Sequence, residues 1–307
     1  MMKNVALRLK NKIVSIIGKT FNTIQLLYFK KGEYIVVNAW MTLYGNKANN
    51  RNWGDELNYY LIRELSGKKI FNYSDLYVRK EANVCCIGSI VDDMANENSL
   101  IWGTGAISDK RKMRCIPKKV YAVRGPLTRK YLISNGIDCP EIYGDPALLL
   151  SRIYNPLKTK KYTIGIIPHY VDYNNPLVER LKQLFGIDAV VISMSGYNDW
   201  HEVIDIISEC DFVVSSSLHG IIISDAYRVP NVWIEFSDNV TGNGFKFRDY
   251  FLSVGREEIE PIHVTKDTSK QELLSCKDEW KPIDINLDKL LSVCPFHIRK
   301  KYMPKVK

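Results

Sequence analysis

The stretch that most constrains the fold of this 307-residue chain runs from residue 211 to residue 236. It reads DFVVSSSLHGIIISDAYRVPNVWIEF, in which a serine-rich loop separates an apolar run from an apolar segment with helical spacing. A Val-Pro break and a second strand-like run follow. This order predicts a strand, a tight turn, a helix and a strand, which is the unit of a parallel α/β sheet. The first N–H groups of such a helix lack intrahelical partners, so the turn can hold an anion.

Strands and helices alternate in the same way on both sides of a lysine-rich stretch at 157–161, which we interpret as a linker. The sequence therefore predicts an α/β protein with two halves. The expected division is a basic amphipathic segment at 1–32, a first half at 33–156, a second half at 162–295 and a basic tail at 296–307.

The formal charge of +9 is concentrated at the two ends of the chain. Residues 1–31 carry seven Lys or Arg and no acid, and residues 297–307 carry five and no acid. A nucleic-acid-binding face would be spread over the fold, so we expect no nucleic-acid partner. Basic ends fit a cytoplasmic protein that touches an anionic membrane surface. A helix packed on the first half, or a loosely ordered leader, is the alternative for the N-terminal segment.

Seven cysteines occur without CxxC spacing, and several lie in apolar runs. This pattern favours free thiols in a reducing compartment, with no disulfide and no zinc site. The sequence suggests no metal and no cofactor. Apolar runs stay shorter than the roughly 18 residues that a membrane-spanning helix needs.

Several polar residues follow predicted strands or open predicted helices. Gly54 and Asp55 begin a helix, where Asp55 is a plausible N-cap. Gly103, Thr104 and Gly105 form a GxG turn after a strand, but the dinucleotide fingerprint is incomplete, so a plain turn is the alternative.

Two cationic residues are candidates for anion binding. Arg124 ends a strand ahead of a Pro-initiated helix, where its planar fork suits a carboxylate or phosphate. The alternative is an arginine that bridges two loops. Lys246 comes directly after a Gly- and Asn-rich stretch at 239–245, and we expect both to form one flexible loop, which either closes over an anion or is merely solvated. Asp145, in YGDPALLL, either contacts a sugar hydroxyl or caps its turn.

Four ordered signatures stand in the chain: NWGDELN (52–58), VRGPLT with YGDPALLL (123–128 and 143–150), IGIIPHY (164–170) and SSSLHGIIISDAYRVPNV (215–232). Together they resemble the polysaccharide pyruvyl transferase family over roughly residues 34–255. The resemblance implies two Rossmann-like domains that face a cleft, as in the GT-B architecture.

The resemblance also implies a reaction. A pyruvyl group moves from phosphoenolpyruvate to two hydroxyls of one sugar, in a saccharide acceptor that can be lipid-linked, and forms a cyclic ketal. This chemistry needs an acid/base with a near-neutral pKa, and cations for the donor's anionic groups. His219 is the expected acid/base, Arg124 the ligand of the donor, and His169 a second donor to phosphate or acceptor. The expected binding residues are Ser215, Ser216, Ser217, Leu218 and Gly220 around the anion, and Gly54, Asp55, Gly103, Thr104 and Gly105 on the acceptor side.

Two other functions fit the same pattern. A GT-B glycosyltransferase would use the turn at 215–220 for a nucleotide sugar, with Asp225 or Glu235 near the ribose. A non-catalytic partner in polysaccharide assembly would use the basic ends to sit on a membrane, with His219 only holding its turn. Acceptor choice is expected to depend on the loops at 46–51 and 108–114.

Overall fold

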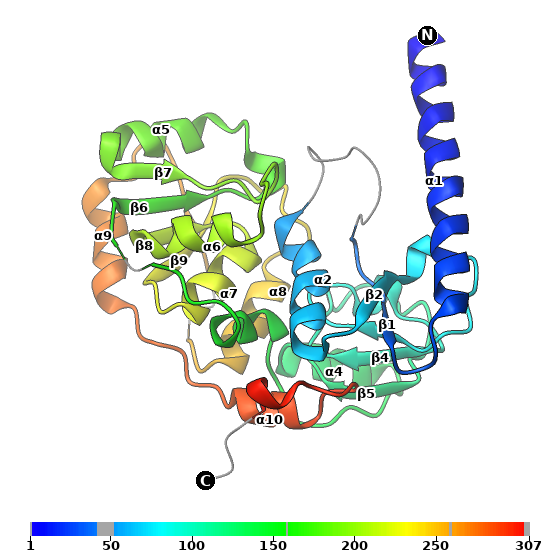
Figure 1. Ribbon diagram of the computed structural model, residues 1–307. Helices are drawn as coiled ribbons and strands as arrows, with labels where there is room; N and C mark the ends of the chain where they lie inside the picture. The colour runs from blue at the N-terminus through cyan, green and yellow to red at the C-terminus, as the bar shows by residue number, and fades with distance from the viewer. Residues whose placement is uncertain (1, 42–51, 158, 258–259, 304–307) are drawn as a thin grey trace.

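The chain forms two parallel β-sheets that stand side by side with helices around them (Figure 1). The structure is a computed structural model and describes residues 2–41, 52–157, 159–257 and 260–303. Within these ranges each sheet has five strands, in the orders β2-β1-β3-β4-β5 and β10-β9-β8-β6-β7. The predicted α/β class, with two Rossmann-like halves, is confirmed.

The elements follow one another in simple alternation. The first half contains α1 (Met2–Tyr28), β1 (Tyr34–Val37), α2 (Trp53–Ser66), β2 (Lys69–Asn72), β3 (Asn83–Cys85), α3 (Val91–Met94), β4 (Ser99–Trp102), β5 (Lys119–Ala122), α4 (Pro126–Ser134) and the 3₁₀ segment η3 (Pro146–Arg152). The second half and the C-terminal region contain β6 (Tyr162–Ile167), η4 (Tyr170–Asp172), α5 (Pro176–Phe185), β7 (Ala189–Val191), α6 (His201–Ser208), β8 (Cys210–Ser215), α7 (Leu218–Ala226), β9 (Asn231–Glu235), α8 (Phe245–Ser253), β10 (Ile262–His263), α9 (Lys270–Glu279) and α10 (Leu287–Ser292).

The strand order is the same in both halves when each half is numbered from its own first strand: second, first, third, fourth, fifth. In such a sheet the chain moves outward from the first strand to one edge and then returns to the other side. The loops after the first and third strands therefore diverge and leave a crevice at the strands' carboxyl ends. In this chain those strands are β1 and β3 in one sheet, and β6 and β8 in the other.

Local sequence signals set the helix ends. At α5, the Asn175 side chain accepts a hydrogen bond from the Leu177 N–H, Pro176 occupies the first turn, and Gly186 ends the helix with a φ of 63°. At α2, the N-cap is Asn52, whose side chain accepts from the Gly54 N–H. The expectation that Asp55 caps α2 is therefore wrong: Asn52 satisfies the helix terminus, and Asp55 lies in the first turn.

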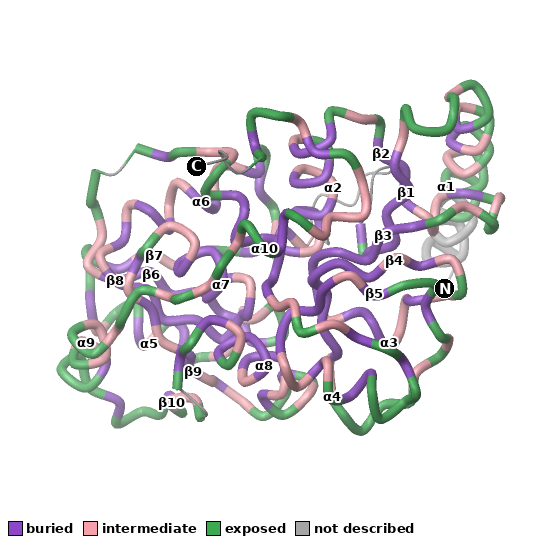
Figure 2. Tube along the Cα trace, turned by 90° about the horizontal axis from the view of Figure 1, so that it is seen from below, coloured by how far each residue is buried: buried purple, intermediate pink, exposed green. Residues whose placement is uncertain are grey.

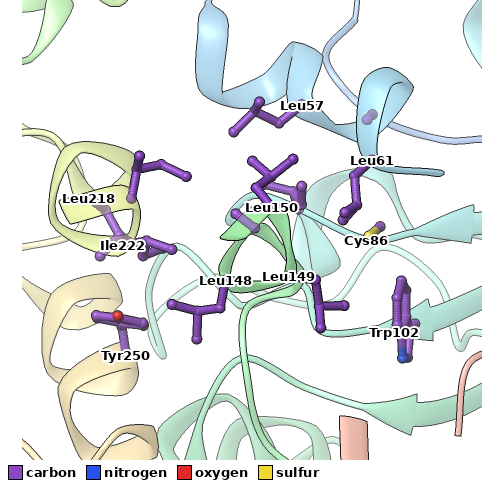
Figure 3. Close-up of a cluster of buried hydrophobic side chains, with 14 of the residues drawn as sticks. Leu57, Leu61, Cys86, Trp102, Leu148, Leu149, Leu150, Leu218, Ile222 and Tyr250 are labelled. Carbon is purple, nitrogen blue, oxygen red and sulfur yellow. The ribbon is translucent and has the colours of Figure 1, made fainter. Parts of the chain in front are cut away.

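The two halves share one hydrophobic core. Leu148, Leu149 and Leu150 of η3 lie between the two halves, with Leu57 of α2 on one side and Leu218 of α7 on another (Figure 3). The same cluster continues into the strands of both sheets, which are mostly buried (Figure 2). The relative position of the halves is thus fixed by packing as well as by the linker.

The C-terminal region returns to the first half, where α10 lies below both sheets (Figure 1). The Trp102 indole N–H donates to the Leu290 carbonyl at 3.0 Å, and the Arg299 guanidinium donates to the Glu64 carbonyl at 2.8 Å. Helix α8 begins at Phe245, directly after the Gly- and Asn-rich residues. The expectation that Lys246 belongs to a flexible loop is therefore wrong, because it lies in the first turn of a helix.

Helix α1 projects away from the sheets (Figure 1). Its C-terminal turns are anchored, since Leu26 is buried with Val36, Phe71 and Leu76. The helix predicted for this segment is present. None of the described helices is both long enough and apolar enough to span a bilayer.

Candidate active site

A cavity of about 300 Å³ lies at the carboxyl ends of the strands of both sheets. Its walls come from the loops after β1, β3, β4, β5, β6, β8 and β9, from α3, and from the first turns of α2, α7 and α8. It therefore occupies the crevice that the strand order of each half predicts. The polar residues lining it include Asn52, Asp55, Ser89, Asp93, Arg111, Arg124, Asp145, His169, Ser217, His219 and Lys246.

The serine turn after β8 forms one wall. The Ser215 hydroxyl donates to the Ser217 carbonyl at 2.8 Å and accepts from the Ser217 N–H. The Ser216 hydroxyl accepts from the His169 N–H at 2.8 Å. These two hydroxyls build the turn and tie it to the loop after β6, so they differ from the expectation that they bind anion oxygens. Ser217 lines the cavity and precedes the first N–H groups of α7.

His219 lies in the first turn of α7 and meets the N-terminus of α2 from the other half. A Cβ atom placed on Gly54 would lie 1.8 Å from Nδ1 of the His219 imidazole. Gly54 is therefore required for the close approach of the two helices. Gly54 leaves room for the imidazole and is not among the residues that line the cavity; its contact with an acceptor stays a prediction.

Burial, together with the positive charges of Lys246 and Arg124, lowers the pKa of His219 to about 3. Burial and Lys246 likewise lower the pKa of His169 to about 3. Without a ligand, both imidazoles are neutral at pH 7. The expected near-neutral pKa of His219 is therefore wrong for the ligand-free cavity, because a cationic, partly desolvated environment disfavours an added proton.

Arg124 reaches the cavity wall from the end of β5 and is fully buried. Its Nε donates to Asp249 of α8 at 3.0 Å, Nη1 to the Ser89 hydroxyl at 2.6 Å, and Nη2 to the Ala106 carbonyl at 2.9 Å. A guanidinium has five N–H groups, so up to two remain for a ligand. Arg124 thus bridges both halves and also borders the cavity, which combines the two interpretations that the sequence left open.

Lys246 and Asp55 come from different halves of the chain, line the same cavity and interact through their charges. Burial and the nearby Arg124 lower the pKa of Lys246 to about 8. Burial raises the pKa of Asp55 to about 7, although the positive charge of Lys246 opposes this rise. Both groups therefore change protonation state close to neutral pH.

Two cavity-lining residues carry buried atoms without a hydrogen-bond partner among the described residues, namely Asp145 Oδ2 and His169 Nδ1. The other Asp145 oxygen, Oδ1, accepts from the Ala147 N–H at 3.0 Å and caps η3. Burial raises the pKa of Asp145 to about 6. Both unpartnered atoms can accept a hydrogen bond from a ligand hydroxyl.

The GxG turn packs against residues that line the cavity, namely Gly88 and Arg124. The Thr104 hydroxyl donates to the Gly88 carbonyl at 2.6 Å, and Gly103 has a φ of 88° and packs on Pro146. A Cβ on Gly105 would lie 2.3 Å from the Arg124 guanidinium carbon. Gly103, Thr104 and Gly105 were expected to line the acceptor side, but they lie outside the cavity lining: Thr104 and Gly105 bond to the Gly88 carbonyl next to Ser89, and Gly103 packs on Pro146. Gly220 likewise packs on Ser215, whereas Leu218 lines the cavity.

Sequence reasoning missed several residues of this site. Asp249 holds Arg124, and its two carboxylate oxygens also accept from the Thr128 N–H and hydroxyl. Ser89, Trp40 and Tyr170 all follow strand ends, and that position is the signal that could have identified them. The loop at 108–114 contributes Arg111, while the loop at 46–51 lies outside the described residues.

The acidic residues that favoured a nucleotide-sugar site have other partners. Asp225 accepts hydrogen bonds in a buried network from Asn231, Tyr250 and Arg256. Glu235 lies 3.9 Å from the His263 imidazole. Within the described part of the chain, no three His, Cys, Asp or Glu side chains are grouped so that they could hold a metal ion.

A sequence profile and two curated relatives show what this chain is similar to. The sequence profile described as polysaccharide pyruvyl transferase matches residues 11–238. The uncharacterized protein L143 of Acanthamoeba polyphaga mimivirus is 30% identical over 67% of this chain and 72% of its own length. The succinoglycan biosynthesis protein ExoV of Rhizobium meliloti is 26% identical over 76% of this chain and 71% of its own. Among solved structures, the wall teichoic acid polymerase TagF covers 95% of this chain and 89% of that chain, at 12% identity and a TM-score of 0.41, a likeness too weak to support an argument.

Proposed function

The chain belongs to the polysaccharide pyruvyl transferase family, and we propose that it transfers a pyruvyl group from phosphoenolpyruvate to two hydroxyls of one sugar. The acceptor would be a surface polysaccharide or its lipid-linked precursor. The observation that carries this proposal is the position of His219 at the N-terminus of α7, close to the buried cations Lys246 and Arg124. The donor carries a carboxylate and a phosphate, and this wall of the cavity offers charge for both.

The proposed chemistry has two additions at C2 of the donor. Protonation of the methylene carbon gives C2 cationic character, and a sugar hydroxyl attacks it and loses its proton. The C2–O bond to phosphate then breaks, inorganic phosphate leaves, and a second hydroxyl of the same sugar closes the ketal. The sum is one donor and one diol giving one ketal and one phosphate, so atoms and charge balance without an oxidant.

We assign His219 as the acid/base of these steps. In the ligand-free cavity its pKa is lowered to about 3 by burial, Lys246 and Arg124. The donor's anionic groups would offset those positive charges, and an imidazole beside bound anions gains affinity for a proton. Binding of the donor would thus raise the pKa of His219 toward the near-neutral value that an acid/base needs.

Asp55 is the second proton-carrying group of the proposal. Burial raises its pKa to about 7, so the carboxyl can take up or release a proton near neutral pH. It lies one residue from Gly54, against which the His219 imidazole packs. Asp145 Oδ2 and His169 Nδ1 are the acceptors available for the sugar hydroxyls that attack.

The first test is ligand-induced thermal stabilisation, comparing phosphoenolpyruvate with a panel of nucleotide sugars. A ligand at 100 times its Kd stabilises the folded state by about 2.7 kcal/mol, which a melting curve resolves. We expect a shift with phosphoenolpyruvate, and a smaller one in Lys246→Met. Lys182→Met is the matched control, because Lys182 is exposed on α5, outside the residues that line the cavity. A shift produced only by nucleotide sugars would favour the glycosyltransferase instead.

The second test measures phosphate release from phosphoenolpyruvate in the presence of saccharide acceptors. His219→Ala should lower turnover by about 10² or more if the imidazole moves a proton. Near-normal turnover in this variant would remove His219 from the acid/base role.

We also propose that α1 holds the enzyme on an anionic bilayer, at the inner face of the cell membrane, where a lipid-linked acceptor would be found. The side of α1 that carries Asn22 and Leu26 is buried. Another side carries Ile13, Ile17, Phe21, Ile24 and Tyr28, which recur at helical spacing and are each about half exposed or more. Because residues 1–31 carry seven Lys or Arg and no acid, an anionic lipid surface complements this segment in charge as well as in hydrophobicity.

Vesicle sedimentation tests the membrane proposal. The double variant Ile17→Glu/Phe21→Glu should lose binding to anionic vesicles. Ile187→Glu should keep it, because Ile187 is 93% exposed but lies in the second half of the chain. Equal binding by the double variant and the control would refute the proposal. A concentration-dependent dimer without vesicle binding would replace the membrane with a second copy of the chain.

A further inference from the structure

Two exposed aromatic side chains line the mouth of the candidate active-site cavity. Trp40 is 61% exposed and Tyr170 is 64% exposed, and both belong to the cavity wall. All six tryptophans lie in the part of the chain that the structure describes, and Trp40 is the one whose side chain is exposed. A single exposed ring is ordinary on a protein surface, but two exposed rings in the wall of one polar cavity can pack on a ligand that has an apolar face.

The two rings occupy equivalent positions in the two halves. Trp40 is the third residue beyond β1, which ends at Val37, and Tyr170 is the third residue beyond β6, which ends at Ile167. Both strands are the first of their sheet, and both border the crevice of the strand order described above. One aromatic ring therefore comes from each half, and each follows a strand end that positions it.

Neither ring sits on a loosely held backbone. Ala39 and Met41 on either side of Trp40 are buried, and the Asn72 side chain donates to the Met41 carbonyl at 2.8 Å. The Tyr170 ring lies 4.4 Å from the His169 ring, with 37° between the planes. The backbone beside each ring is therefore tied to the fold, at Met41 by Asn72 and at His169 by the Ser216 hydroxyl.

The chemistry around the rings indicates which ligand they suit. Asn52, Asp55 and Asp93 line the same cavity and offer amide and carboxylate oxygens. A pyranose has an apolar face of C–H bonds, which packs on an aromatic ring, and an edge of hydroxyls, which donate to such oxygens. A flat apolar ligand would match the rings but not the carboxylates.

We propose that Trp40 and Tyr170 form the binding platform for a pyranose ring of the acceptor saccharide at the mouth of the cavity. The identification of this saccharide as the acceptor rests on the proposed function, whereas saccharide binding itself does not require turnover. The platform would place the sugar next to Asp145 and His169, whose unpartnered atoms lie deeper in the wall.

Saturation-transfer NMR tests the platform directly. The probes are methyl β-D-glucopyranoside, methyl β-D-galactopyranoside and their β-1,4-linked disaccharides. We expect the wild-type protein to show contact with at least one probe at its ring C–H protons. Trp40→Ala should weaken this contact about tenfold, Trp40→Phe should retain most of it, and Tyr170→Ala should behave like Trp40→Ala. Tyr77→Ala is the control, since Tyr77 is 53% exposed in the first half and is held by a hydrogen bond to Thr23, away from the cavity.

A second measurement separates this inference from the proposed function. Thermal stabilisation by phosphoenolpyruvate should be the same in Trp40→Ala as in the wild type. In the phosphate-release assay the acceptor KM should rise about tenfold while the donor KM stays constant. If saccharide contact is lost in Trp40→Ala but no phosphate is ever released, the platform stands and pyruvyl transfer fails. The platform is overturned if the wild type binds none of the probes, or if the substitutions leave acceptor binding unchanged. It is also overturned if the substitutions weaken phosphoenolpyruvate binding as much as they weaken acceptor binding.

Discussion

Gly54→Ala tests the contact on which the geometry of the site depends. The added Cβ would lie 1.8 Å from Nδ1 of His219, whereas ordinary van der Waals contact begins at 3.4 Å. The imidazole must therefore move by about 1.6 Å, or α2 and α7 must separate by that amount. A misplacement of about 1 Å can cost a catalytic group about 10² in rate. We expect turnover to fall by at least that factor.

Gly54→Ala should change the stability of the fold much less than it changes the rate of turnover. In an open helix position, replacing Gly by Ala adds roughly 0.5–1 kcal/mol to stability. Here that gain is opposed by the displaced imidazole, so the melting temperature should change little or fall modestly. The assay pairs phosphate-release kinetics with thermal unfolding of the same samples. A large loss of rate in a folded protein is the expected signature.

The double variant Gly54→Ala/His219→Ala completes the test. Removing the imidazole removes the three atoms nearest to the added methyl, so Gly54→Ala should then have a much smaller effect on stability and leave the residual rate unchanged. Gly18→Ala, the same change in α1, is the control and should keep full activity. Activity within twofold of wild type for Gly54→Ala, or additive losses in the double variant, would refute the reasoning.

Three further outcomes follow from buried charges. Asp249→Asn should destabilise the fold by about 3–5 kcal/mol, measured by denaturant unfolding, because Arg124 would remain buried without its counter-charge. Arg124→Lys should weaken phosphoenolpyruvate binding in calorimetry, because an ammonium cannot replace the guanidinium fork. The raised pKa of Asp55 means that stability is complete below about pH 4 and falls as pH rises toward 7. Asp55→Asn should therefore be more stable than the wild type at pH 8, by at most about 4 kcal/mol, and equal to it at pH 4.

Elements with strong local signals were predicted well from the sequence. Strand β6 coincides with a clear apolar run, and helix α5 with an Asn-Pro start and a Gly stop, signals that leave little ambiguity in the sequence. Helix α8 was missed, since Gly and Asn residues precede it and its apolar residues show no clear stripe. It is stabilised by tertiary contacts, such as Phe247 stacked on Trp233 with ring centroids 4.4 Å apart.

The candidate site was predicted in part. The turn that carries His219 and Ser217 was identified because strand, turn and helix are contiguous in the sequence. The pairing of Arg124 with Asp249 was not, because 125 residues separate them and each alone is an ordinary charged residue. The roles of Ser215 and Ser216 could not be predicted either, since a hydroxyl that binds a ligand and one that ties a turn have the same local sequence.

The contacts that shape the site are also the contacts that join the two halves. Moving the halves apart would break the buried pair of Arg124 and Asp249. It would also expose Leu148, Leu149 and Leu150, at roughly 1.5–3 kcal/mol for each fully buried side chain. That total is comparable with the whole stability of a typical domain, about 5–15 kcal/mol. We therefore expect substrates to enter past the aromatic rim at the mouth, and expect any closure to involve the loops around the cavity and not a hinge between the sheets.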